Sequence, residues 1–267
     1  MMLIEHNSYY GHELVFQEYC NVYDPIQRYI QHGFTVGTDS FFLNDKLTYA
    51  VCNNRVAKQL TARGAKAVVV GAPYLYLNEE APSVNYRANS LLAIPTHSIG
   101  QKKLPLNTWN TYLDFIEAKR RSFVDTEILL HPTDYYNEEV ARLFIKRGFG
   151  AVTCSESLEN YRTWGGCEPA FLYYLRRCIK NYSNVSCNRI CTAVFYALYE
   201  GLKVNIEGPK MKTEPRDFDD ELVEDDKWIG DNYPNIASGF GTYLDAKIEL
   251  GTKLTKEDLI PKLWGEL

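Results

Sequence analysis

Short apolar runs alternate along the chain with segments in which apolar residues recur at helical spacing. Trp109, Tyr112, Leu113 and Ile116 stand at positions i, i+3, i+4 and i+7, which predicts an amphipathic helix. The apolar runs are short and bounded by turn-forming residues, as buried strands are. They are Met2–Ile4, Ile26–Ile30, Leu47–Val51, Ala67–Val70, Leu91–Ile94, Ile128–Leu130, Ala151–Thr153 and Lys203–Ile206, with Val185 at the centre of one more. This alternation predicts an α/β fold with parallel sheets.

The alternation occurs in two series, which a polar, proline-containing stretch separates. Residues 78–90 form this stretch and are predicted to be a linker. We therefore expect two Rossmann-like lobes, residues 1–85 and 86–210, of which the first is short. Residues 211–267 would follow as an acidic loop and C-terminal helices, because charged residues run from Lys210 to Asp226 and Thr255 is a candidate helix cap.

Short polar side chains stand before several other predicted helices and are candidate N-caps. Asn53 or Asn54 precedes a helix that Gly64 would end, and Asn137 precedes another. Asn107 or Thr108 has the same position before the helix that carries Trp109. Further helices are predicted over Glu13–Tyr19 and Phe171–Ile179.

Composition narrows the classes of function. The formal net charge of the 267 residues is -5, which argues against a nucleic-acid-binding surface. Seven cysteines occur and none falls in a CxxC pair, so we expect reduced, mostly buried thiols and a cytoplasmic protein. The chain has no apolar run of about 18 residues, so any membrane association would be peripheral.

Three of the five histidines follow predicted strands: His32, His97 and His131. Open α/β sheets bind ligands at the carboxyl ends of their strands. Pro132 cannot continue a central strand, so it leaves His131 at such an end. One histidine in this position commonly has a structural role, but three favour a binding site. No HxH, HExxH or CxxC spacing is present, and we expect no metal site.

A second candidate for anion binding is the stretch from Ser186 to Thr192. Ser186, Asn188 and Thr192 bring hydroxyls and an amide to a predicted helix start, where free N–H groups and the helix dipole favour phosphate. Ordinary N-capping by Ser186 or Asn188 is the alternative interpretation. The GxGxxG, GxxxxGK[ST] and GxSxG motifs are absent. We expect this stretch and His131 to bind the same phosphate.

The order of these short motifs resembles that of bacterial GT-B glycosyltransferases that use cytidine nucleotides. Sialyltransferases and Kdo transferases of this type carry a His-Pro and a later Ser/Thr-rich motif. Teichoic-acid glycerophosphotransferases carry a similar series. Here the series would be His32-Gly33, Gly71-Ala72-Pro73, Pro95-Thr96, His131-Pro132 and Ser186-Cys187-Asn188. The chain lacks the acidic Asp/Glu-Asp/Glu-Gly motif of the sialyltransferases, and its first lobe is shorter than is usual in this fold.

The resemblance implies two Rossmann-like lobes that face a cleft, with the short first lobe on the acceptor side. It implies a metal-independent glycosyltransferase without a cofactor, which moves a sugar from a CMP- or CDP-linked donor to a bacterial surface polysaccharide or glycolipid. Such an enzyme would work in the cytoplasm or at the inner face of the membrane. Its site residues would be His131, Ser186, Asn188 and Thr192 for the donor phosphate, Gly71, Thr96, His97 and Ser98 along the cleft, and His32, or else Asp39, as general base.

Three alternatives stay open. A CDP-polyol phosphotransferase would use the same histidines and form a phosphodiester in place of a glycoside. A non-catalytic partner in polysaccharide assembly would fit the short first lobe and the acidic segment. A nucleotide-sugar epimerase would share the fold.

Overall fold

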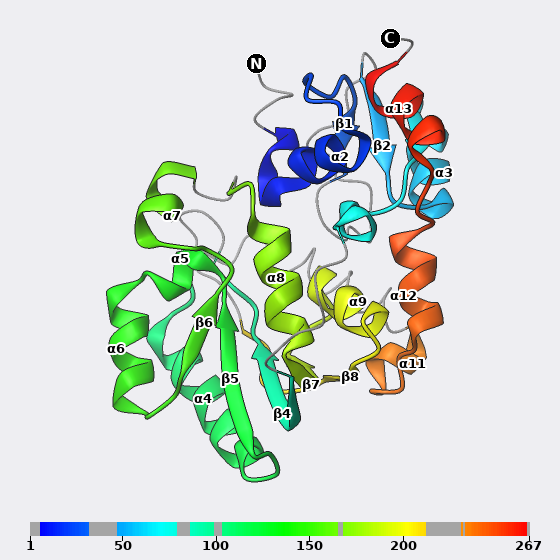
Figure 1. Ribbon diagram of the computed structural model, residues 1–267. Helices are drawn as coiled ribbons and strands as arrows, with labels where there is room; N and C mark the ends of the chain where they lie inside the picture. The colour runs from blue at the N-terminus through cyan, green and yellow to red at the C-terminus, as the bar shows by residue number, and fades with distance from the viewer. Residues whose placement is uncertain are drawn as a thin grey trace. The chain divides into compact units, whose positions relative to one another are not determined.

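Two parallel sheets, of three and five strands, form the framework of the protein (Figure 1). The computed structural model describes residues 6–31, 47–78, 86–98, 103–164, 168–211, 231 and 233–265. The α/β class predicted from the sequence is confirmed. Among the described helices, none has the length and apolar character needed to span a membrane.

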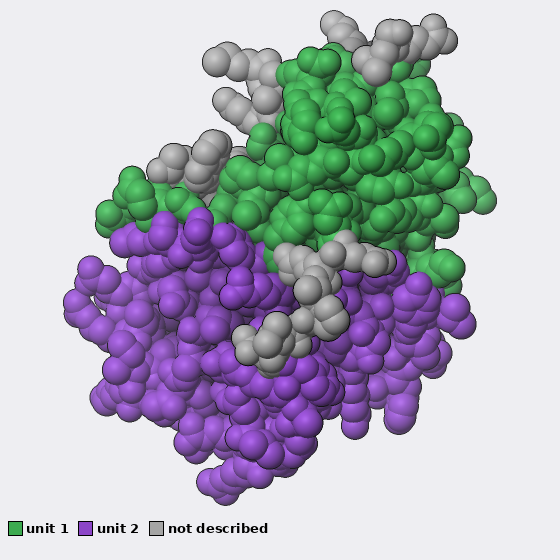
Figure 2. Space-filling model, in the orientation of Figure 1, with its two compact units in different colours: residues 1–80, 159–173, 246–267 green, residues 81–158, 174–245 purple. Residues whose placement is uncertain are grey.

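The chain forms two compact units, which are coloured separately in Figure 2. Unit 1 contains residues 1–80, 159–173 and 246–267. Unit 2 contains residues 81–158 and 174–245. The chain therefore enters unit 1 three times, and the C-terminal helices fold with the N-terminal residues.

Unit 1 is built on the three-stranded sheet. Its strands are β1 (Tyr29–Ile30), β2 (Thr48–Val51) and β3 (Lys66–Val69), in this order and all parallel. Helix α3 (Asn54–Ala62) connects β2 to β3, and Val56 and Leu60 of this helix pack with Tyr49 and Val51 in one apolar cluster. The side chain of Asn53 accepts a hydrogen bond from the N–H of Val56, which confirms the predicted cap.

The remaining elements of unit 1 are short helices. They are η1 (Tyr9–Gly11), α2 (His12–Cys20), η3 (Pro73–Tyr76), part of α7 (Leu158–Trp164), the end of α12 (Tyr243–Leu250) and α13 (Lys256–Trp264). Thr255 caps α13 by accepting a hydrogen bond from the N–H of Asp258, as the sequence predicts.

A close approach of two backbone segments explains two glycines of unit 1. The N–H of Ala72 donates to the carbonyl of Leu250 at 2.7 Å. A Cβ on Gly71 would lie 2.6 Å from the carbonyl oxygen of Thr252, and a Cβ on Gly251 would lie 1.9 Å from that of Cys52. Both glycines also have φ of +78°, which L side chains rarely adopt. These segments can therefore meet only where side chains are missing.

Unit 2 is built on the five-stranded parallel sheet, whose order is β6-β5-β4-β7-β8. The strands are β4 (Arg87–Ile94), β5 (Asp125–Leu130), β6 (Ala151–Thr153), β7 (Tyr182–Cys187) and β8 (Lys203–Ile206). Within unit 2, the chain first forms the central strand β4. It then adds β5 and β6 on one side of β4, and afterwards β7 and β8 on the other side. The strand order therefore reverses between β4 and β7.

Helices cover both faces of this sheet. Helix α4 (Leu106–Arg120) and helix α6 (Glu138–Lys146) pack on one face, where Trp109, Ile116 and Phe144 meet Ile128 of β5. Because parallel crossovers are right-handed, the connections made after the reversal lie on the opposite face. They are α8 (Phe171–Lys180) and α9 (Thr192–Tyr199), drawn over β4, β7 and β8 in Figure 1. The short helices α5 (Pro132–Tyr135) and α11 (Pro234–Ala237) complete the described elements.

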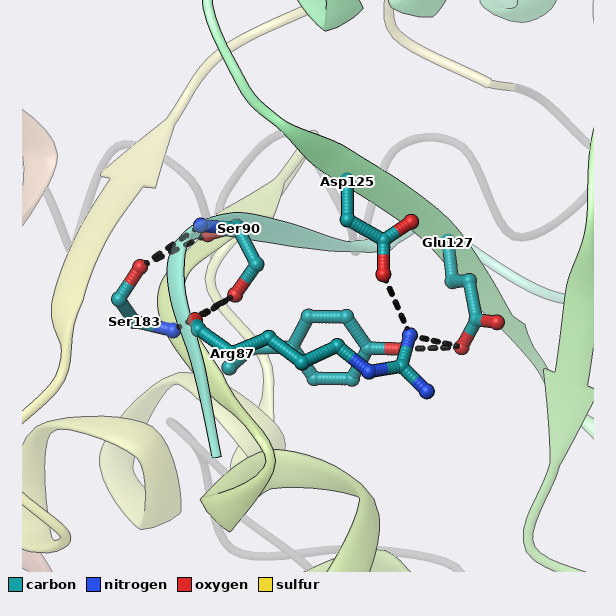
Figure 3. A network of polar contacts seen from close by, with 6 residues as sticks. Arg87, Ser90, Asp125, Glu127 and Ser183 are labelled. Carbon is teal, nitrogen blue, oxygen red and sulfur yellow. Dashed lines mark hydrogen bonds and ion pairs between the residues drawn. The ribbon is translucent and has the colours of Figure 1, made fainter. Parts of the chain in front are cut away.

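A polar network joins the amino ends of β4, β5 and β7 (Figure 3). Arg87 donates to Asp125 at 2.6 Å and lies 3.4 Å from Glu127. Ser90 and Ser183 exchange hydrogen bonds across β4 and β7, with N–H to Oγ distances of 2.9 and 3.1 Å. The linker predicted over residues 78–90 is therefore wrong from Arg87 onward. Its polar residues belong to β4, because neighbouring strands supply their partners.

Several predicted boundaries differ from the observed ones. Pro105 precedes α4, so Asn107 and Thr108 lie inside its first turn. Helix α9 begins at Thr192 with Cys191 as its N-cap residue, so neither Ser186 nor Asn188 caps it. Of the strand predicted over Ile26–Ile30, only Tyr29–Ile30 is formed. The strand predicted over Met2–Ile4 and most of the acidic segment lie outside the described residues.

Candidate functional site

The candidate site lies at the carboxyl ends of β4, β5 and β7, where the strand order of unit 2 reverses. In open α/β sheets, the two loops that leave such a switch point run in opposite directions and open a crevice for ligands. Here these loops are residues 95–98 after β4 and residues 188–191 after β7. Residues 131–134 follow β5, the other neighbour of β4. We call these three loops the switch-point edge.

Asn188 connects the two loops on either side of the reversal. Its Oδ1 accepts hydrogen bonds from the N–H of Thr96 at 2.8 Å and from Oγ1 of Thr96 at 3.0 Å. Its Nδ2 donates to the carbonyl of Pro209 at 2.9 Å. The side chain is buried and both ends of its amide are used. Asn188 therefore fixes the shape of the edge.

His97 and His131 stack against each other at this edge. Their ring centroids lie 4.4 Å apart and their planes differ by 17°. The two residues come from neighbouring strands, since His97 follows β4 and His131 follows β5. Both side chains are half-buried. Two imidazoles thus lie side by side at the edge where open α/β sheets commonly bind ligands.

Hydrogen bonds set different tautomers in the two rings. Nδ1 of His131 accepts from the N–H of Thr133 at 3.3 Å and lies 3.0 Å from Oγ1 of Thr133, which can donate to the same nitrogen. In the neutral ring the proton is therefore assigned to Nε2. Nδ1 of His97 lies 2.7 Å from the carbonyl oxygen of Ser98, which can only accept, so this nitrogen carries a proton. In the neutral pair, Nε2 is therefore a donor on His131 and an acceptor on His97.

Burial keeps His131 neutral. Desolvation lowers the pKa of His131 well below its ordinary value, and the neighbouring His97 lowers it further. Like charges at this separation repel, so a positive charge on His97 would oppose one on His131.

A buried carboxylate lies beneath the histidines. Asp134 is 1% exposed, and its two oxygens accept from Ser98, from N–H at 2.8 Å and from Oγ at 2.5 Å. Burial raises the pKa of Asp134, while the two bonds from Ser98 and the nearby His97 lower it. Ser98 is itself buried, and its Oγ accepts from the N–H of Leu104 at 3.0 Å.

Two cysteines lie where β7 leads into α9. The thiol of Cys187 donates to the sulfur of Cys191, and this bond lowers the pKa of Cys191 to about 7 against the opposing effect of burial. The N–H groups of Val194 and Ala193 and the charge of Arg189 act in the same direction. The pKa of Cys187 is raised by the same bond and by burial. The six described cysteines are free thiols, as predicted.

The structure brings four of the predicted residues together at the switch-point edge: Thr96, His97, His131 and Asn188. Ser98 lies beside them but is buried against Asp134. Thr192 is the first residue of α9. Ser186 lies within β7, where its Oγ donates to Glu207 at 3.3 Å, and Lys119 pairs with the same carboxylate.

Of the three remaining predicted residues, the structure describes only Gly71. Gly71 belongs to unit 1 and permits the close backbone contact described above. His32 and Asp39, the candidate bases, lie outside the described residues. Among the residues that the structure does describe, no cluster of three His, Cys, Asp or Glu could hold a metal ion.

Sequence reasoning missed Asp134 and Cys191. Asp134 follows directly in the stretch His131-Pro132-Thr133-Asp134, but its position gives no sign that the carboxylate is buried. Cys191 stands four residues after Cys187. The sequence predicted only reduced, mostly buried thiols and gave no sign that these two sulfurs interact.

No protein-family model and no curated protein matches the chain. Among solved structures, the chain is similar to TarM from S. aureus, seen as a variant in complex with fondaparinux, alpha-GlcNAc-glycerol and UDP. The sequence identity is 8% and the TM-score is 0.40, over 87% of this chain and 49% of TarM. The chain thus spans about half the length of TarM.

Proposed function

We propose that unit 2 binds the phosphate of a nucleotide-sugar donor at the switch-point edge and that the protein is a glycosyltransferase. The observation that carries the proposal is the stacked pair of His97 and His131 at the reversal of the sheet. Parallel sheets bind nucleotides at this position, and imidazoles donate to phosphate oxygens without bringing a fixed charge.

The two tautomers suggest different roles for the two rings. Nε2–H of His131 would donate to a phosphate oxygen, and Nε2 of His97 would take up a proton and become the cation beside the phosphate. Together they would stabilise the negative charge that develops on the leaving nucleotide when the glycosidic bond breaks. This stabilisation comes from fixed side chains, so the proposed reaction needs no metal ion.

The motif order in the sequence supports a finer assignment. We infer a CMP- or CDP-linked donor and, as acceptor, a hydroxyl of a bacterial surface polysaccharide or glycolipid at the inner face of the membrane. His32 is the proposed base that removes the acceptor proton, with Asp39 as second choice, since an imidazole titrates near neutral pH. Ser186, Asn188 and Thr192 remain proposed neighbours of the phosphate, with Asn188 acting through the loop that it fixes.

A thermal-shift panel with CMP, CDP, UDP and GDP tests the proposal. A ligand that binds only the folded state stabilises it by about 2.7 kcal/mol at one hundred times its Kd. We expect the largest rise in Tm with a cytidine nucleotide. Equal and negligible shifts with all four nucleotides at millimolar concentration would refute nucleotide binding.

A polyol phosphotransferase is the second candidate, because the same motif series occurs in glycerophosphotransferases that use CDP-linked donors. The two activities leave different bonds in the product. Mass spectrometry of the product would show a phosphodiester for phosphotransfer and a glycoside for sugar transfer. Turnover by the purified chain that is lost in His32→Ala would exclude a purely non-catalytic role.

A further inference from the structure

We propose that Asp134 is a positioning residue, which acts through Ser98 to hold His97 against His131 and directs the proton taken up on phosphate binding to His97. The ligand in this inference rests on the proposed function. The position and titration of the His97 ring do not, so they can be measured without a ligand.

The hydrogen bonds of Ser98 determine that Ser98 donates to Asp134 and that Asp134 accepts. Ser98 Oγ accepts from the N–H of Leu104, so its own proton is directed to Oδ1 of Asp134. The N–H of Ser98 donates to Oδ2. Both oxygens of Asp134 therefore act as acceptors, which is the role of an ionised carboxylate.

Asp134 joins two strand ends. Its backbone N–H donates to the carbonyl of His131 at 2.9 Å, which anchors it to the loop after β5. Its side chain accepts hydrogen bonds from the N–H and Oγ of Ser98 in the loop after β4. The carbonyl of Ser98 then accepts from Nδ1 of His97. This chain of bonds fixes the His97 ring and leaves its Nε2 as the atom available to accept a proton.

A residue that only linked the two loops would not need the negative charge of Asp134. Burying a carboxylate is unfavourable unless it is bonded or faces a cation, and a neutral amide could also link the loops. Asp134 and His131, both in the segment after β5, interact electrostatically with His97. Burial opposes a positive charge on His131. The negative charge of Asp134 therefore acts on His97, the other ring of the pair.

The test compares wild type with Asp134→Asn by ¹⁵N-histidine NMR in the ligand-free protein. Asp134→Asn removes a negative charge that interacts with His97, so we expect the protonation midpoint of His97 to lie at lower pH in the variant than in wild type. Asp114→Asn is the matched control, because Asp114 is an exposed residue of α4 paired with Arg147. An unchanged His97 midpoint in a folded Asp134→Asn protein would overturn the proposal.

A second variant covers the case in which Asp134→Asn does not fold. Ser98→Ala keeps the carboxylate and removes one bond of the link. We expect the ¹⁵N signal of a hydrogen-bonded Nδ1–H at His97 to weaken through exchange between tautomers. A His97 tautomer as well defined as in wild type would show that the link does not position the ring.

The ligand-dependent part uses calorimetric titration of CMP in two buffers that differ in ionisation enthalpy. We expect wild type to take up a proton on binding and Asp134→Asn to take up less. Failure of wild type to bind CMP would count against the proposed function while the ligand-free titration still decides the role of Asp134. Binding with equal proton uptake in both proteins would overturn the role of Asp134 alone.

Discussion

At the scale of single residues, the geometry of the candidate site depends on side chains that hydrogen-bond to the loops around them. Asn188 satisfies a backbone N–H, a hydroxyl and a carbonyl from two different loops. His97 and His131 each use Nδ1 for a local bond, which determines what Nε2 can do. A site of this kind is preorganised, because its parts need not move when a ligand arrives.

We expect Asn188→Ala to lower the free energy of unfolding by about 2 kcal/mol, since it removes the hydrogen-bond partners of a partly buried N–H of Thr96 and of the carbonyl of Pro209. Urea denaturation measures this change. Asn110→Ala is the control, because the Asn110 side chain makes an exposed hydrogen bond to the carbonyl of Leu106 within α4. A loss no larger than that of the control would show that Asn188 does not fix the edge.

Cys191 gives a prediction that depends on pH. Since its pKa is lowered to about 7, alkylation of this half-buried thiol by iodoacetamide should be half-maximal at about pH 7. An ordinary thiol reaches this point at about pH 8.5. The variant Cys187→Ala removes the S–H donor, so its Cys191 should titrate at higher pH. Peptide mapping that places both midpoints at the ordinary value would contradict the S–H···S contact.

At the scale of elements, apolar periodicity predicted most of the strands and helices but not their polar extensions. Asn53, Asn137 and Thr255 cap the helices that the sequence assigned to them. The first half of β4 was mistaken for a linker, because its partners Asp125 and Ser183 are distant in sequence. The local sequence pattern indicates which helix or strand a segment can form. Whether polar residues extend a strand depends on hydrogen-bond partners that are distant in the sequence.

The contact between α3 and α12 in unit 1 also depends on distant partners. Glu249 is buried and accepts from Nε and Nη2 of Arg55 at 3.3 and 2.7 Å, while its backbone carbonyl accepts from Asn53 at 2.7 Å. We expect Glu249→Ala to lower the free energy of unfolding in urea denaturation by about 3 kcal/mol, because it removes the carboxylate that faces the largely buried guanidinium of Arg55.

Glu138→Ala is the matched control for this change. Glu138 pairs with Arg142 one helical turn away, and both side chains are largely exposed, at 82% and 77%. Exposed pairs contribute about 0.5 kcal/mol or less. Equal costs of the two substitutions would mean that the Arg55–Glu249 pair does not hold α12 to α3.

At the scale of the whole molecule, the parallel α/β class and the edge that carries the site could be predicted, whereas the course of the chain could not. Strand-end histidines indicated the carboxyl edge of the second sheet, and His97 and His131 do stack there. The return of residues 159–173 to unit 1 leaves no periodic signal in the sequence. The tautomers of the two histidines and the burial of Asp134 could not be predicted either, because they depend on backbone partners and packing that exist only in the folded chain.

The central claim, that His131 at the switch-point edge binds the donor phosphate, is tested most directly by calorimetric titration of CMP into wild type and two His131 variants. His131→Ala removes the imidazole, and His131→Asn removes it while keeping an acceptor for the N–H of Thr133. We expect both variants to remain folded and to lose at least about tenfold in affinity, or about 1.4 kcal/mol, with Asn110→Ala unchanged. Wild-type affinity for CMP in a folded His131→Asn protein would contradict the account.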